Sequence, residues 1–312
     1  MISRRQALVG VGATVSALSL STSPVLSSGI SAGRATKIVS VGGAITETLF
    51  ALKLGERIRA VDTTSTYPDA AKALPKVGYL RELSAEGVLA MQPDLVLLSA
   101  EAGPPAAIAQ LKAAGIPVQQ IAIGRTPDGV RSMVEAIGQA TGTQNSAAEL
   151  AAQIGAGFDS LAAALPAEQT TRVLLLLSAG AGPLLGAGAN TAAASIIALG
   201  GGQLAFPEMD GYKAVSLEPV LAADPDWLLF PSHVAMALGG ADGIAALDVV
   251  SKTRAGQAGR VAFVDSHYLL GFGPRAPQAA ADLATLFYPD ITIPTIGRDA
   301  VPSSLLGLMG KQ

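Results

Sequence analysis

A tyrosine and an arginine two positions apart are the first residues of this sequence that could hold a ligand. Tyr79 and Arg81 stand in the stretch GYLRELSAEG. In an extended segment this spacing places both side chains on one face. Ionising a tyrosine at pH 7 costs about 4 kcal/mol, and a nearby guanidinium or ferric ion lowers that cost. Ferric haem accepts a tyrosinate ligand in some proteins. From spacing alone, a loop tyrosine packed beside a solvated arginine remains the simpler interpretation.

A repeat in the chain supplies the next candidates. The stretch SAEGVLA, from Ser84, returns as SLEPVLA from Ser216, 132 positions later. A Gly-Tyr pair and a Pro-Asp pair flank each copy, so Tyr212 is the counterpart of Tyr79. Each serine is suited to begin a short helix as its N-cap. The repeat predicts two similar halves that face a shared cleft.

Glu86 and Glu218 occupy equivalent places in the two copies, each two residues after the serine. An acid in the first turn of a helix complements the helix dipole and stabilises it by roughly 0.3–1 kcal/mol. Two equivalent acids on one rim would also suit the docking of a basic partner with two-fold symmetry. The residues alone leave both interpretations open.

Other motifs that could carry chemistry are scarce. His233 and His267 are the only histidines and lie far apart in sequence, without an acidic cluster, so we interpret both as structural. The glycine-rich stretch at 182–191 lacks the Gly-x-Gly-x-x-Gly spacing and is predicted to be a loop at the mouth of the cleft. No nucleophile elbow, phosphate-binding loop or cysteine occurs, so the sequence does not indicate an enzyme.

The elements that must position these residues alternate between strand and helix. Short apolar runs separated by helical patterns fill residues 36–126 and return in 166–312, whereas 127–165 has only helical periodicity. This order predicts an α/β fold: two Rossmann-like lobes with mostly parallel sheets, joined by a long rigid helix, with a ligand cleft between the lobes.

The N-terminus has the pattern of an export signal. Arg4 and Arg5 precede a short uncharged apolar run, so residues 1–35 are predicted to be a signal peptide of the twin-arginine type. Its removal would change the formal net charge from −3 to −6, which argues against nucleic acid as a partner. Without cysteine there is no disulfide and no lipid-anchored N-terminal Cys. These features predict a periplasmic protein that is not lipid-anchored or stably inserted in the membrane.

Five stretches of the chain together resemble a known family. The stretches KIVSVGGAITETLFAL, VGYLRELSAEGVLAMQPDLVL, SAGAGPLLGAGANTAA, GYKAVSLEPVLAADPDWLL and LLGFGPRAPQAAADL cover nearly the whole chain after the predicted signal. Together they resemble the periplasmic haem-binding proteins of haem ABC importers. The resemblance implies a protein that captures haem b in the cleft and delivers it to an inner-membrane permease dimer with its ATPase, without being an enzyme.

The resemblance also implies roles for residues in the cleft. Tyr79 matches the tyrosine that ligates the haem iron, and Arg81 matches the arginine that supports that phenolate or the propionates. Arg275, in the motif GFGPR, would contact a propionate, and Tyr212 would line the opposite wall. One departure matters: the loop LSAGAGPLLG has no histidine where some relatives place a further ligand. This favours five-coordinate iron through Tyr79 and weakens the case for two stacked haems.

The resemblance also implies a docking role for two glutamates, and three alternatives to haem import remain open. Glu86 and Glu218 match the acids that dock on arginines of the permease dimer. The same fold could instead carry a ferric siderophore or a corrinoid. An exported enzyme acting in the cleft would need a general base, for which the sequence offers only scattered acids and two histidines. A haem-scavenging protein without a transporter is the third alternative.

Overall fold

The structure is a computed structural model that describes residues 35–179 and 182–296, together with the backbone of 306–308. The signal peptide predicted for residues 1–35 therefore lies, apart from its last residue, outside the described residues. Ala32–Gln312 form one compact unit. Among the described helices none combines the length and the apolar character needed to span a bilayer.

The first half contains a sheet of four parallel strands in the order β2-β1-β5-β6. Three of the strands are almost entirely buried because helices cover the sheet, as the apolar runs predicted. The strands are β1 (Ile38–Val41), β2 (Ile58–Val61), β5 (Leu95–Ser99) and β6 (Val118–Ile121). The helices of this half are α1 (Gly43–Ala51), η1 (Gly55–Arg57), α2 (Asp69–Lys72), α3 (Ala85–Ala90) and α4 (Pro105–Ala113).

A small hairpin lies beside this sheet and carries the first candidate residues. Its strands β3 (Gly78–Tyr79) and β4 (Glu82–Leu83) are antiparallel, so Leu80 and Arg81 form a two-residue loop. Gly78 has a φ of 108°, a conformation that favours glycine, which explains why a glycine precedes the tyrosine. Backbone hydrogen bonds from Leu83 N to Gly103 O and from Gly103 N to Leu80 O fix the hairpin on the loop after β5.

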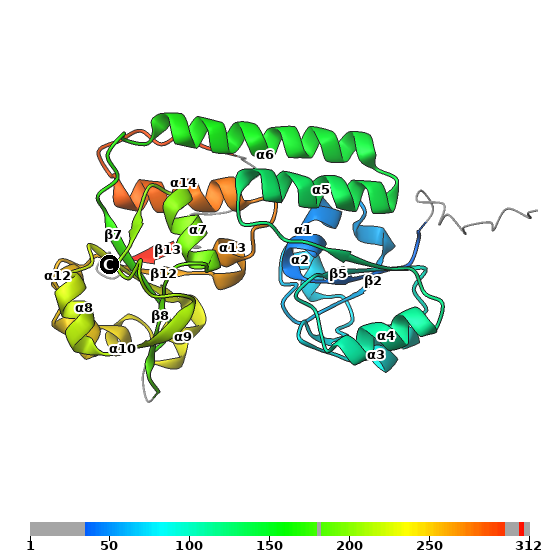
Figure 1. The fold of residues 1–312 in the computed structure, drawn as a ribbon, viewed down its shortest axis with the longest axis horizontal. Coiled ribbons are helices and arrows are strands. Elements are labelled where there is room, and N and C mark those ends of the chain that lie inside the picture. Colours follow the sequence, from blue (N-terminus) through cyan, green and yellow to red (C-terminus); the bar gives the residue numbers. More distant parts are fainter. Residues whose placement is uncertain (1–34, 180–181, 297–305, 309–312) are drawn as a thin grey trace, which may run out of the picture. The chain divides into compact units, whose positions relative to one another are not determined.

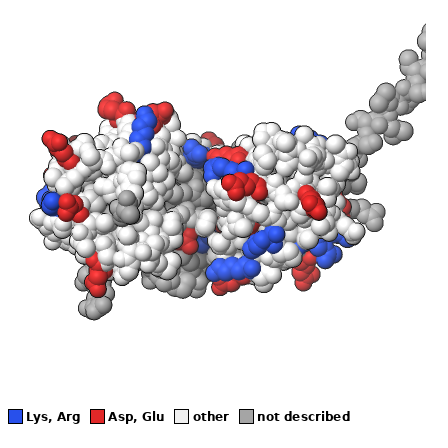
Figure 2. All heavy atoms as spheres, turned by 90° about the horizontal axis from the view of Figure 1, so that it is seen from below, with Lys and Arg blue, Asp and Glu red and all other residues white. Residues whose placement is uncertain are grey.

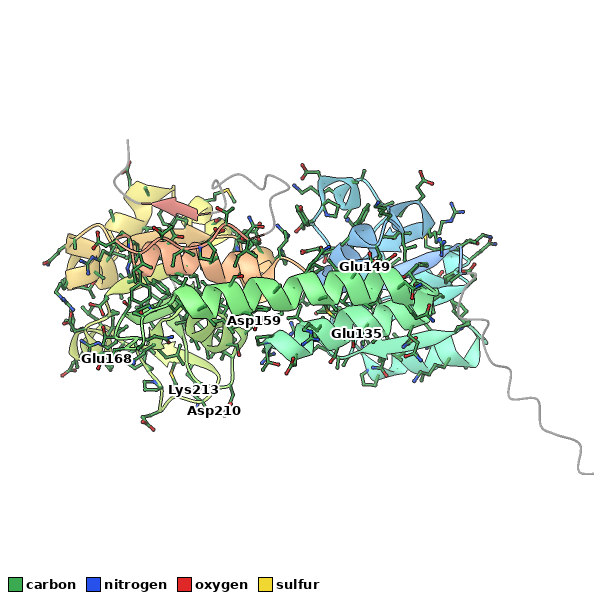
Figure 3. The ribbon with its side chains drawn as sticks, turned by 90° about the horizontal axis from the view of Figure 1, so that it is seen from above. Glu135, Glu149, Asp159, Glu168, Asp210 and Lys213 are labelled. Atoms are coloured by element: carbon green, nitrogen blue, oxygen red, sulfur yellow. The ribbon has the colours of Figure 1, made fainter. Side chains whose placement is uncertain are left out.

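The connection between the halves is helical, as expected, but it consists of two antiparallel helices and not of one long helix. α5 (Pro127–Thr141) begins at the N-cap Thr126 and ends at Gly142, whose left-handed conformation reverses the chain into α6 (Gln144–Ala164). α5 packs on α1, and α6 packs on α14 (Ala276–Phe287) of the second half (Figure 1). The side chains of Glu135, Glu149 and Asp159 project from the exposed face of this pair (Figure 3).

The second half contains a mixed sheet in the order β10-β8-β7-β11-β12-β13, with β9 beside β7. Its centre is parallel, as expected, but β8 runs antiparallel to β7 and β10, and β13 runs antiparallel to β12. The strands are β7 (Arg172–Ser178), β8 (Leu184–Ala187), β9 (Gln203–Leu204), β10 (Tyr212–Val215), β11 (Trp227–Pro231), β12 (Val261–Val264) and β13 (Leu306–Leu308).

The prediction of a loop at 182–191 was therefore wrong in part, because four of these residues form β8. The strand β8, with the sequence Leu-Leu-Gly-Ala, pairs with β7 on one side and with β10 on the other. Because glycines stand near both of its ends, the sequence pattern indicated a loop. The remaining helices are α7 (Ala192–Leu199), α8 (Leu217–Ala223), α9 (Ser232–Ala237), α10 (Ala241–Ala245), α11 (Asp248–Ser251), α12 (Arg254–Gln257) and α13 (Ser266–Leu270).

The core does not divide at the predicted segment boundaries. One cluster of buried side chains includes Ile45 of the first half, Ile137 and Leu161 of the connecting helices, and Leu175 and Leu283 of the second half. Smaller clusters fill the other face of each sheet. The boundaries 36–126, 127–165 and 166–312 therefore stay a prediction, since burial is continuous across the connecting helices.

Candidate ligand-binding site

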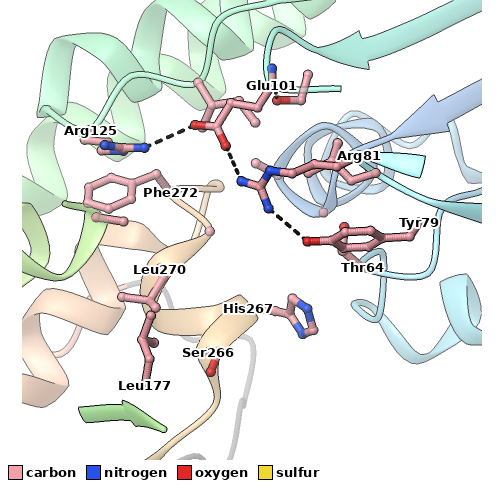
Figure 4. Close-up of a pocket in the computed structure, with 18 of the residues that line it drawn as sticks. Thr64, Tyr79, Arg81, Glu101, Arg125, Leu177, Ser266, His267, Leu270 and Phe272 are labelled. Carbon is pink, nitrogen blue, oxygen red and sulfur yellow. Dashed lines mark hydrogen bonds and ion pairs between the residues drawn. The ribbon is translucent and has the colours of Figure 1, made fainter. Parts of the chain in front are cut away.

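A cavity of about 530 Å³ lies where the loops of both halves meet. This volume is typical of a small-molecule site. Its lining combines apolar, aromatic and charged side chains from both sheets (Figure 4). The polar and aromatic residues used below are Tyr79, Arg81, Glu101, Arg125, Tyr212, His233, Ser266, His267 and Phe272.

The strands of the first sheet place their charged residues at one edge. Glu101 follows the carboxyl end of β5, and Arg125 follows the carboxyl end of β6. Gly42 and Gly43, directly after β1, line the cavity at the same edge. Ligands of open α/β sheets bind at this edge because neighbouring parallel strands all end there. The cavity therefore lies where this topology predicts a ligand.

Tyr79 and Arg81 are brought together with two residues that the sequence analysis did not single out. Arg81 Nη1 donates to the hydroxyl of Tyr79 over 2.9 Å, and its Nη2 donates to Glu101 Oε2 over 2.9 Å. Arg125 Nη2 donates to Glu101 Oε1 over 3.1 Å. Arg125 Nη1 donates to the backbone carbonyl of Asn190, in the second half, over 3.2 Å. Figure 4 shows these four side chains along one wall of the cavity.

The electrostatics of this wall are those of two cations that share one anion. The hydrogen bond to Tyr79, with the charge of Glu101 added to it, raises the pKa of Arg81 above its ordinary value. The side chains of Arg81, Glu101 and Arg125 are 57%, 49% and 41% exposed. A guanidinium has five N–H donors, so both arginines keep donors free for an anionic ligand.

Tyr212, the counterpart of Tyr79 in the repeat, lines the same cavity from the other half. It is half-buried at the start of β10, and its hydroxyl accepts a hydrogen bond from Ala193 N in the first turn of α7, over 3.4 Å. Tyr79, by contrast, is 39% exposed and presents its hydroxyl to the cavity. The two tyrosines thus share one cavity, and their hydroxyls accept from different donors: a guanidinium for Tyr79 and a backbone N–H for Tyr212.

Both histidines, interpreted above as structural, are exposed and line the cavity, so both are in reach of a ligand. His267 lies in the first turn of α13, and its Nδ1 is 3.5 Å from Thr66 Oγ1. His233 lies in the first turn of α9. Each follows the carboxyl end of a buried strand, β12 or β11, and that position was the signal that could have identified them.

Arg275 is not among the residues that line the cavity, in contrast to its expected propionate contact. Its Nη2 pairs with Glu47 Oε2 of α1 at 2.9 Å, and its backbone N–H donates to Glu47 Oε1 over 2.9 Å. The guanidinium carbon lies 3.3 Å from the ring centroid of Tyr67. Gly273 permits this approach, since a Cβ there would lie 3.0 Å from the carboxyl carbon of Glu47. The geometry assigns Arg275 to a contact between the two halves and gives no support to a propionate contact.

Glu86 and Glu218 are exposed in the first turns of α3 and α8, and neither lines the cavity. Three residues after each glutamate, on the same side of its helix, an exposed leucine follows. Leu89 is 36% exposed and Leu221 is 42% exposed. The repeat thus presents the same acidic and apolar pair in both halves.

The described residues contain no group of three His, Cys, Asp or Glu side chains that could hold a metal ion. On the face drawn in Figure 2, basic and acidic side chains of the described residues alternate over a largely uncharged surface. Such a mixed pattern differs from the basic footprint of a nucleic-acid-binding protein.

The fold and the cavity define an α/β binding protein whose ligand site lies between two sheets. Residues 38–268 match the family model described as periplasmic binding protein, and the chain belongs to this family.

Solved structures and curated relatives agree with this assignment. The periplasmic heme-binding protein BhuT, in complex with two hemes, is 42% identical, with a TM-score of 0.75 over 81% of this chain and 98% of its own. The periplasmic heme-binding protein RhuT from Roseiflexus sp. RS-1, in apo form, is 38% identical, with a TM-score of 0.76 over 82% and 99%. A vitamin B12-binding protein of Vibrio campbellii is 28% identical over 65% of this chain and 73% of its own.

Proposed function

We propose that this chain captures haem in the periplasm and delivers it to an ABC permease. The observation that carries the proposal is the tyrosine hydroxyl of Tyr79, held by Arg81 at a cavity between two sheets. The identity of 42% and 38% to two heme-binding proteins, over almost their whole lengths, supports haem as the ligand. The more distant likeness to a B12-binding protein keeps a corrinoid as the second candidate, and a ferric siderophore stays an alternative of the same fold.

The chemistry of the lining suits a flat apolar ring that carries iron and two carboxylates. The phenol of Tyr79 supplies one oxygen to the iron, and Arg81 Nη1 holds that oxygen in place with a hydrogen bond of 2.9 Å. Arg125 replaces Arg275 as the second cation available to a propionate, because its donors reach the cavity. Leu177, Leu270 and Phe272 supply apolar contacts for the ring.

We expect the iron to have Tyr79 as its one protein ligand. The loop LSAGAGPLLG lacks a histidine, but His233 and His267 reach the cavity from other elements, so histidine is available to a second haem. A relative with two hemes bound shows that a fold of this kind has room for both. The number of haems per chain is therefore part of the test below.

Delivery to a permease completes the proposal. Glu86 and Glu218, with their adjacent leucines, form the two docking points, which would meet arginines of a permease dimer. The export route is the twin-arginine pathway, from Arg4 and Arg5, and the absence of cysteine supports a protein without a lipid anchor. The role is binding rather than catalysis, which agrees with the family.

The test is an absorption titration of the exported form with hemin, run in parallel on Tyr79→Phe and Tyr212→Phe. We expect a saturable ferric tyrosinate spectrum in the wild type and in Tyr212→Phe, and loss of the tyrosinate band in Tyr79→Phe. The equivalence point gives the number of haems bound to each chain. Cyanocobalamin and a ferric siderophore are titrated under the same conditions.

The outcomes separate the alternatives. A tyrosinate band that survives in Tyr79→Phe but not in Tyr212→Phe would keep haem and move the ligand to the other half. Saturable binding of cyanocobalamin or siderophore in place of hemin would overturn the haem proposal. Chemical turnover of bound hemin in air with an added reductant, faster than that of free hemin under the same conditions, would favour the enzyme alternative. Hemin binding without delivery of hemin to a permease would favour a haem-scavenging protein.

A further inference from the structure

Glu101 occupies a central place in the site although no motif points to it. It lies on the loop between β5 and α4, and its two carboxylate oxygens bind different arginines. Oε2 accepts from Arg81 and Oε1 accepts from Arg125, over 2.9 Å and 3.1 Å. Each arginine uses its other terminal nitrogen for a second partner. The carboxylate therefore stands at the middle of a chain of contacts, with one arginine on either side.

The two ends of this chain differ in what they hold. At one end, Arg81 donates to the hydroxyl of Tyr79. At the other end, Arg125 donates to the carbonyl of Asn190, which belongs to the second half. The side-chain amide of Asn190 in turn donates to Asp210 Oδ1 over 2.8 Å. A series of contacts thus leads from the proposed iron ligand to two loop residues of the second half, Asn190 after β8 and Asp210 before β10.

The backbone makes the tyrosine end of this series rigid. Gly103 exchanges backbone hydrogen bonds with Leu80 and Leu83, so the hairpin and the loop that carries Glu101 form one unit. The amide of Glu101 donates to Ser99 Oγ over 3.2 Å, which fixes the start of the loop at the strand end. Long arginine side chains lose much rotational freedom when held, and one hydrogen bond to a phenol compensates for little of that loss.

We propose that Glu101 is the positioning residue that holds Arg81 on Tyr79 and Arg125 on the second half, and so couples the iron ligand to the contact between the two halves. This inference rests on the proposed function, because only that function makes Tyr79 an iron ligand. The hydrogen bonds that form the coupling are present without ligand. Because all three charged side chains are partly exposed, salt screens the coupling in the free protein. A ligand that covers them excludes water and strengthens it.

The first arm of the test needs no ligand. We would record the arginine side-chain NMR signals of the free protein, assigned with Arg81→Lys and Arg125→Lys. Glu101→Gln removes the charge and keeps the shape, and Glu208→Gln makes the same charge change at an exposed acid of the second half. Glu101→Gln is expected to speed guanidinium rotation in both arginines at once, and Glu208→Gln in neither. If only one arginine responds, or neither does, the coupling is wrong.

The second arm uses hemin and the wild-type protein as reference. Glu101→Gln is expected to raise the pH at which the tyrosinate band is lost on acidification and to speed hemin release to apomyoglobin about three- to tenfold. In an Arg81→Ala background, Glu101→Gln should leave the acidification midpoint unchanged, because it acts on Tyr79 through Arg81. A full effect in that background would show direct action and overturn the positioning role.

The two arms keep this inference separate from the proposed function. If the wild type shows no tyrosinate band with hemin, the haem proposal fails, while the NMR arm still decides whether Glu101 couples the two arginines. If the wild type binds hemin and Glu101→Gln behaves as Glu208→Gln in both arms, the haem proposal stands and this inference is overturned.

Discussion

At the scale of single residues, neighbours decide what an arginine does. Arg81 and Arg125 each share the carboxylate of Glu101 and keep donors free at the cavity. Arg275 lies in a glycine-rich loop of the kind that often surrounds ligands, yet it is 14% exposed and pairs with Glu47, which is 10% exposed. Its positive charge is paired between α1 and the start of α14, where the ion pair joins the two halves.

Arg275→Ala is expected to lower the free energy of unfolding by about 3 kcal/mol, because it leaves the carboxylate of Glu47 buried without its partner. Urea unfolding measures this, with Arg59→Ala, an exposed arginine of β2, as the control. Hemin affinity of the two variants should be alike. A large loss of hemin affinity in Arg275→Ala at unchanged stability would restore the propionate contact.

A half-buried acid near this ion pair, Asp282, gives a pH-dependent prediction. Burial raises the pKa of Asp282 despite the opposing hydrogen bond from Tyr268, whose hydroxyl lies 2.7 Å from Asp282 Oδ2. Arg275 and Glu47 are the other charged groups that face Tyr268. A raised pKa means that the folded state binds the proton of Asp282 more tightly than the unfolded state does, so this stabilising contribution is lost as the pH rises through the folded-state value.

Asp282→Asn removes that titration and keeps an acceptor for Tyr268. From pH 4 upward, the difference in unfolding free energy between variant and wild type should therefore shift in favour of the variant. Thermal unfolding at a series of pH values between about 4 and 7 measures this shift. A difference that stays constant, or moves toward the wild type with rising pH, contradicts the raised pKa.

At the scale of elements, the repeat forms α3 and α8 at equivalent places, but the two helices differ in how their N-termini are capped. Ser84 accepts a hydrogen bond from Gly87 N over 3.0 Å, so it caps α3 as predicted. Ser216 stands at the N-cap of α8 without such a bond. The same residue type in the same register therefore has two different local roles.

This difference makes a matched pair of substitutions informative. Ser84→Ala should cost about 1 kcal/mol of stability, the typical worth of a serine N-cap. Ser216→Ala should change stability by less than about 0.5 kcal/mol, as for other surface substitutions. Urea unfolding of both variants decides the matter, and equal losses would show that the two caps are equivalent in solution.

The proposed docking points, Glu86 and Glu218, belong to the same two helices. Glu86→Ala combined with Glu218→Ala should lower hemin uptake by proteoliposomes that contain the permease and ATPase, by up to about tenfold, because rim charges govern the rate of encounter. Hemin affinity should not change. The control combines Glu135→Ala with Glu149→Ala, two exposed acids of the connecting helices. Equal uptake in both double variants would remove the docking role from α3 and α8.

At the scale of the whole molecule, several independent contacts restrain the two halves. The helix α5 packs on α1 and α6 packs on α14, the ion pair of Arg275 with Glu47 joins the start of α14 to α1, and Arg125 reaches Asn190. One buried apolar cluster is continuous through α1, α5, α6 and α14. Such a frame resists a wide hinge motion, since opening it would expose apolar surface and separate a buried ion pair.

We therefore expect only a small closure when hemin binds. The radius of gyration from small-angle X-ray scattering should change by less than about 1 Å between the free and loaded forms. The variant Arg275→Ala, with the ion pair removed, serves as the comparison and should show a larger change. A change of several ångströms in the wild type would contradict a rigid connection.

The sequence by itself determined the α/β class and the helical connection between the halves. Both features depend on local periodicity, which acts over short stretches of chain. The family resemblance, not the periodicity, implied that Tyr79 and Tyr212 lie in the cleft, and both line the cavity. The strands β1 and β5 are four and five consecutive buried residues, and the Thr126 cap begins a regular helix, so each could be predicted without knowledge of the rest.

Only the tertiary structure decided which side chains share the cavity and which are bound elsewhere. Glu101, Arg125, His233 and His267 come from four different loops or helix starts, and their meeting depends on how the two halves are placed. Arg275 was assigned to the cavity by its motif, but Glu47, 228 residues away in sequence, holds it outside. Charged side chains choose partners through space, and a linear pattern does not contain the distances that make one carboxylate closer than another.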